Sequence, residues 1–104
     1  MRPQIIRGTT PTIKFCFKDI DVADITTAYI TVKQMKKTII EKDISSASKE
    51  DNHLVWTLSQ EETLSLEPKT SAVVVCDWKL NTSLRGLSHE LIADVKDPGK
   101  DEVI

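Results

Sequence analysis

The sequence has few of the residues that most often mark a specialised site. It holds two cysteines, two histidines and three glycines, and its aromatic residues are two Trp, two Phe and one Tyr. The glycines, Gly8, Gly86 and Gly99, are too scattered to form a loop that cradles a phosphate. Fourteen basic and 16 acidic residues give a formal net charge of −2. Because no basic excess exists to attract phosphates or anionic lipids, we predict neither nucleic-acid binding nor membrane binding.

Long apolar runs are also missing. The longest obvious block, residues 72–76, is far too short to span a bilayer. No apolar stretch of signal-peptide length follows Met1-Arg2-Pro3, so we expect the chain to be made and retained in a reducing cytoplasm. In that compartment Cys16 and Cys76, which lie far apart inside apolar stretches, are predicted to be buried free thiols rather than a disulfide or a metal-binding pair.

The polar residues do not form a catalytic or metal-binding pattern. His53 and His89 each lie on an apparent strand, away from both cysteines, and no nucleophile elbow occurs. No Cys-x-x-Cys or His-x-x-x-His spacing supports zinc. The loop at residues 19–24 holds three aspartates but lacks the glycine and the distal glutamate of a calcium-binding EF-hand. We therefore predict no catalytic residue, no metal and no cofactor.

The chain does contain a series of short segments in which apolar and polar residues alternate, the pattern of half-buried strands. We predict strands over residues 3–7, 12–18, 28–34, 38–42, 53–58, 71–80 and 87–96. About seven strands at this spacing indicate an all-β fold, a single antiparallel β-sandwich domain over residues 1–104. Trp56 and Trp78 fall on the apolar register of their strands and are expected in the core.

One short helical turn interrupts the strands. Ser59 and Glu62 have the spacing of a capping box, in which each side chain bonds the main-chain N–H of the other residue. Pro68 limits the helix to about one turn, with Leu64 and Leu66 positioned to fill one end of the core. We expect residues 45–52 to form a polar loop and residues 101–104 to form a tail or a short final strand.

Three segments carry a resemblance to a known family. They are residues 8–15 (GTTPTIKF), residues 58–64 (LSQEETL) and residues 101–104 (DEVI), which occur in the same order in short proteins that prophages of Gram-positive bacteria encode among tail and baseplate genes. The chain resembles these small structural proteins over its whole length. Its opening block is similar to the start of the immunoglobulin-like N-terminal domain of phage baseplate upper proteins. One departure is the strand at residues 71–80, where Trp78 and a run of valines replace a more polar alternation.

The resemblance implies an immunoglobulin-like fold and a non-enzymatic virion protein of the tail or baseplate. Such a protein would be made in the bacterial cytoplasm, contact other phage structural proteins and form a homo-oligomer in the assembly. A capsid decoration protein and a module that binds cell-surface saccharides remain alternatives, although only Tyr29 among the aromatic residues lies off the core register. Exposed strand edges and loops supply the candidate protein contacts: Gln4, Ile5, Ile6, Met35, Lys36, Lys37, Val103 and Ile104.

Overall fold

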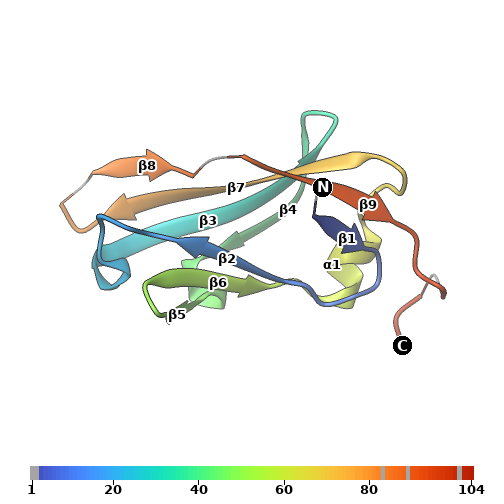
Figure 1. The fold of residues 1–104 in the computed structure, drawn as a ribbon, viewed down its shortest axis with the longest axis horizontal. Coiled ribbons are helices and arrows are strands. Elements are labelled where there is room, and N and C mark those ends of the chain that lie inside the picture. Colours follow the sequence, from blue (N-terminus) through green and yellow to red (C-terminus); the bar gives the residue numbers. More distant parts are fainter. Residues whose placement is uncertain (1–2, 83, 89, 101) are drawn as a thin grey trace.

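The computed structural model describes residues 3–82, 84–88, 90–100 and 102–104. Its strands form two facing sheets, with the helix α1 at one end of the molecule (Figure 1). The elements in chain order are β1 (Gln4–Ile6), β2 (Thr12–Cys16), η1 (Val22–Asp24), β3 (Ile25–Gln34), β4 (Lys37–Asp43), η2 (Ile44–Ser46), β5 (Ser48–Glu50), β6 (His53–Thr57), α1 (Gln60–Leu64), β7 (Ser71–Leu80), β8 (Arg85–Leu87) and β9 (Leu91–Lys96).

The larger sheet has the strand order β1-β9-β7-β3-β4, and β8 pairs with β7 beyond the end of β9. The smaller sheet has the order β2-β6-β5. The predicted all-β sandwich is therefore confirmed. The strands are not all antiparallel, however, because β1 runs parallel to β9. A parallel pair is possible here since β1 and β9 are the first and last strands, joined through the whole sandwich rather than by a hairpin.

The core lies between the sheets and follows the alternation of the strands. Trp56 on β6 is 0% exposed, as expected from its register. Its indole N–H donates to the main-chain oxygen of Asp43 at 2.9 Å, and its ring meets that of Phe15 edge to face at 5.9 Å. Buried residues from both sheets and from the segments beside α1 complete the core: Ile5, Ile25, Ala28, Ile30, Val32, Ile40, Leu54, Leu58, Leu66, Ala72, Val74, Cys76, Ala93 and Val95.

Two segments differ from the prediction. The polar stretch at residues 45–52 contains the end of η2 and the short strand β5. All residues of β5 are exposed, so no apolar alternation could reveal this strand. The strand predicted over residues 87–96 is divided into β8 and β9. It breaks at Ser88, whose hydroxyl accepts a bond from the Cys76 N–H at 2.8 Å. Residues 102–104 form a tail without strand pairing.

Candidate contact surfaces

The helix α1 begins with the predicted capping box. The Ser59 hydroxyl accepts from the Glu62 N–H at 3.1 Å, and the Glu62 carboxylate accepts from the Ser59 N–H at 2.8 Å. The Lys42 ammonium lies 3.0 Å from the same carboxylate. Burial acts to raise the pKa of Glu62, but the Ser59 N–H and the Lys42 charge outweigh it and lower the pKa overall. The carboxylate thus ties β4 to the start of α1.

The three segments that carry the resemblance meet at α1. The hydroxyl of Thr63, which is 0% exposed, donates to the Thr9 main-chain oxygen at 2.8 Å and accepts from the Gly8 N–H at 2.9 Å. The Gln60 side-chain amide holds Ile104 through two main-chain bonds, at 3.1 and 2.8 Å. We call residues 8–11, 58–64 and 102–104 the α1 junction. The hydrogen bonds of Thr63 and Gln60 join these three segments into one connected unit at this end of the sandwich.

The loop between β1 and β2 is shaped to fit the α1 junction. Gly8 has a φ of +80°, in the left-handed region that favours glycine, and a Cβ atom there would lie 3.4 Å from Leu64. The Arg7 guanidinium donates to the Leu64 main-chain oxygen at 3.0 Å and forms a 3.1 Å ion pair with Asp97. Arg7 therefore satisfies a carbonyl at the C-terminal end of α1 and links it to the segment after β9.

The predicted contact residues near the N-terminus occupy an edge of the larger sheet. Gln4 and Ile6 are exposed on β1. Ile5 is only 5% exposed and packs in the core, which corrects its assignment to the surface. Its side chain points inward because it alternates with those of Gln4 and Ile6.

The other predicted contact residues lie on a hairpin tip and on the tail. Met35 and Lys36 form the tip between β3 and β4, with φ angles of 50° and 64°, and Lys37 begins β4. Met35, Lys36 and Lys37 are all exposed. Val103 and Ile104 are exposed beside α1. The structure brings β1 and the tail to the same end of the molecule, whereas the hairpin tip stands apart above the larger sheet (Figure 1).

A surface that the sequence analysis missed lies on the outer face of the larger sheet. Apolar side chains form a strip across neighbouring strands: Tyr29 on β3, Val73 on β7, Leu87 on β8, and Ile92 on β9, with Val75 on β7, only 8% exposed, on the same face. We call it the outer strip. The register places Val73 beside Ile92 and sets Asp77 between Tyr29 and Leu87. Only the order of the strands reveals the strip, because its members come from four separate segments.

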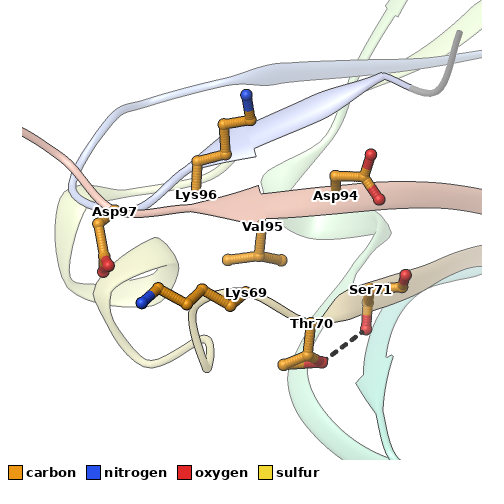
Figure 2. A pocket seen from close by; sticks show the side chains of 7 residues that line it. All are labelled: Lys69, Thr70, Ser71, Asp94, Val95, Lys96 and Asp97. Carbon is orange, nitrogen blue, oxygen red and sulfur yellow. Dashed lines mark hydrogen bonds between the residues drawn. The ribbon is translucent and has the colours of Figure 1, made fainter.

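A surface hollow of about 510 Å³ lies between the start of β7 and β9. Its lining includes two lysines and two aspartates, Lys69, Lys96, Asp94 and Asp97. Figure 2 shows that the Lys69 and Lys96 ammonium groups point in different directions, so they do not converge on one ligand. A smaller hollow of about 180 Å³ lies beside the outer strip and is lined by Thr27, Tyr29, Asp77, Trp78, Lys79 and Arg85.

The candidate catalytic and metal-binding residues do not come together in one site. The His53 ring nitrogen Nδ1 is 2.7 Å from the Asp51 main-chain oxygen and 3.2 Å from that of Glu50, a local structural contact. His89 falls outside the described residues. Within the described ranges, no three His, Cys, Asp or Glu side chains gather as a metal site. No helix in the same ranges is long and apolar enough to cross a bilayer.

Comparison with known protein structures identifies the type of fold. The structure superposes on a crystal structure of the immunoglobulin-like domain of mouse leukocyte-associated immunoglobulin-like receptor 1, determined as a strand-swapped dimer, with a TM-score of 0.51 and 13% identity. The match covers 88% of this chain and 84% of the receptor chain. The chain has an immunoglobulin-like fold. No protein-family model matches the chain, and no curated protein matches its sequence.

The immunoglobulin-like fold gives the two cysteines a new context. Antibody domains join their sheets by a disulfide between strands B and F, and the strand orders here make β2 and β7 the equivalents of those strands. Cys76 on β7 is buried as predicted, but Cys16 on β2 is exposed, which corrects the prediction of two buried thiols. Phe15 and Phe17 pack against the core, so Cys16 between them faces outward. The two thiols therefore stay free.

This arrangement predicts that the two thiols differ in reactivity. At pH 8, Ellman's reagent is expected to titrate one thiol per folded chain rapidly and the second only after unfolding in urea. Cys76 is buried, and burial followed by the charge of Asp77 raises its pKa to about 12, so it carries almost no thiolate at pH 8. Cys16→Ser should abolish the rapid phase. Rapid reaction of both thiols in the folded chain would contradict the assignment.

Proposed function

We propose that this immunoglobulin-like domain is a non-enzymatic structural component of a (pro)phage particle, in its tail or baseplate, and acts through contacts with other phage structural proteins. The phage context rests on the resemblance carried by residues 8–15, 58–64 and 101–104. These segments converge at the α1 junction and form one unit of structure there. The proposal includes a homo-oligomer in the assembled particle and synthesis in the bacterial cytoplasm.

The outer strip is the observation that favours protein contacts. Lys33 and Glu41 lie beside its apolar side chains on the same face, whereas Asp77 lies within the strip. Exposed apolar surface with a charged rim is typical of protein interaction sites. Leu87 is 62% exposed although it pairs within the sheet, so it is the strongest single candidate for a contact.

The test is to induce the prophage in the strain that encodes the chain and to quantify the protein in purified particles by mass spectrometry. A few to a few tens of copies per particle are expected for a tail or baseplate component. Leu87→Glu should lower incorporation by about tenfold or more, the effect of losing a central apolar contact. Leu84→Glu is the control, because Leu84 is similarly exposed but lies outside the outer strip. Absence of the protein from particles would overturn the proposal.

Two alternatives predict other results. Hundreds of copies per particle would identify a capsid decoration protein instead. The 180 Å³ hollow beside Tyr29 favours a saccharide-binding module as the second candidate, since an aromatic ring next to Asp77 and Arg85 offers both stacking and hydrogen bonds. Binding on a glycan array that Tyr29→Ala removes would support this candidate, and an array without binding would dispose of it.

A further inference from the structure

One edge of the smaller sheet has main-chain groups that no strand covers. The Leu58 N–H donates to the Pro11 oxygen at 2.9 Å, and the Phe17 N–H donates to the Asn52 oxygen at 3.2 Å, so odd-numbered residues of this segment bond toward β6. In an antiparallel ladder the intervening residues direct their N–H and C=O groups the opposite way. Thr12, Lys14 and Cys16 therefore present main-chain donors and acceptors along the outer edge of β2. No strand within the described residues pairs with that edge.

The side chains beside this edge are also incompletely covered. The inward-facing residues Ile13 and Phe15 of β2, and Phe17 just after it, are only partly buried. By contrast, Ile5 on β1 and Ile40 on β4, which also lie on edge strands, are 5% and 4% exposed. The edge position of β2 therefore does not by itself explain the exposure of its apolar side chains.

A groove lies beside the open edge of β2. It measures about 200 Å³, and Ile13, Val74, Leu91 and Ala93 contribute its apolar lining. Leu91 shares the inward face of β9 with Ala93 and Val95, yet it is 39% exposed, because the sandwich is open on this side. An added strand along β2 would place every second side chain over this groove.

The charge beside the edge indicates what such a strand would carry. Lys14 and Lys18 are exposed on the outer face of β2 and its extension, and neither forms an ion pair with the described residues. A strand paired with β2 would bring its own outward side chains beside these lysines, where carboxylates are favoured. A second copy of β2 would instead bring its lysines there, so self-pairing is disfavoured.

We propose that the β2 edge accepts an extended segment of another protein in which apolar and acidic residues alternate. Main-chain bonds to Thr12, Lys14 and Cys16 would add the segment as a fourth strand of the smaller sheet. Its apolar residues would enter the groove by Leu91. Its carboxylates would face Lys14 and Lys18. This inference rests on the proposed role in protein contacts and names the chemistry of one partner.

The test uses the full chain and a fluorescein-labelled peptide, Ser-Glu-Ile-Glu-Val-Glu-Ile-Ser, acetylated and amidated. Anisotropy should show saturable binding, and the peptide with lysine in place of every glutamate should bind at least about tenfold more weakly. Lys14→Pro should weaken binding by at least about tenfold, because proline removes the N–H at the open edge without removing a bond to β6. Lys14→Thr keeps that N–H and should retain part of the binding.

A matched pair of variants separates this edge from the outer strip. Leu91 and Ile92 are adjacent and 39% and 42% exposed, but they lie on opposite faces of β9. Leu91→Gln should abolish peptide binding, whereas Ile92→Gln, a change in the outer strip, should leave it intact; thermal melting checks that both variants fold. Three outcomes would overturn the inference: binding is lost in Ile92→Gln alone, all variants bind equally, or no saturable binding is seen. Dimerisation of the chain that Lys14→Pro abolishes would also overturn it and identify a second copy as the occupant.

These readouts do not depend on the particle. If the protein is absent from particles but binds the peptide as expected, only the phage role fails. If it is incorporated normally but binds no peptide, only the β2 inference fails.

Discussion

Replacing Thr63 with valine is expected to lower the free energy of unfolding by about 2–4 kcal/mol. Valine keeps the shape of the side chain but removes the hydroxyl that donates to Thr9 and accepts from Gly8. Two main-chain groups at the α1 junction would then lose their partner, and each such group costs about 1–3 kcal/mol when it is shielded from water. Urea denaturation followed by circular dichroism measures the change.

Thr10→Val is the matched control for this change. Thr10 lies in the same loop, but it is exposed and its side chain makes no hydrogen bond to the described residues, so its substitution should change stability by less than about 0.5 kcal/mol. Hydrogen exchange of the Gly8 amide should speed up in Thr63→Val and stay slow in Thr10→Val. Equal stabilities of the two variants would show that the junction does not depend on the Thr63 hydroxyl.

Gly86→Ala is expected to destabilise the domain by about 1–3 kcal/mol through overpacking. A Cβ atom at position 86 would lie 2.1 Å from Cζ2 of Trp78, so the indole or the β8 hairpin must move. Trp78 also meets Phe17 edge to face at 5.9 Å, which restricts the movement of its ring. Thermal melting measures the loss, and a shift of tryptophan fluorescence reports the displaced indole.

Gly99→Ala provides the comparison, since a Cβ atom there meets nothing within 4 Å. Its melting temperature and fluorescence should match those of the unaltered chain. If Gly86→Ala behaved in the same way, β8 would be free to move away from Trp78 without cost, and the indole would not be held by that hairpin.

Local patterns were sufficient to predict much of the fold. β7 has the predicted bounds, Ser71–Leu80. Its alternating run buries Ala72, Val74 and Cys76, whereas Trp78 farther along the same face is only partly buried against the core. The capping box at Ser59 forms as predicted because it involves residues only three positions apart. Cys16 shows where two sequence rules conflict. Cysteine is among the most often buried residues, but the alternation from residue 12 to residue 18 places Cys16 with Lys14 on the outer face, and the alternation decides the outcome.

These local patterns could not predict how segments far apart in the sequence are arranged in space. The α1 junction depends on main-chain groups at Gly8, Thr9 and Ile104 meeting side chains about 40–55 residues away, and no local periodicity encodes such a meeting. The outer strip and the open β2 edge likewise follow from strand order, which the sequence analysis did not predict. The contact roles of Gln4, Ile6, Met35 and the tail remain predictions, with their side chains on the surface as expected.

The parallel pairing of β1 with β9 has a consequence for the newly made chain. β1 leaves the ribosome before every other strand of the domain, and β9 leaves it after all of them. At about 5–20 residues per second, roughly 5–20 s of synthesis separate the two strands. Throughout that interval β1 lacks its partner strand, and the site that Ile5 fills in the core is not yet complete. Chains interrupted before β9 would therefore keep an unpaired first strand, and cellular proteases should degrade them faster than finished copies.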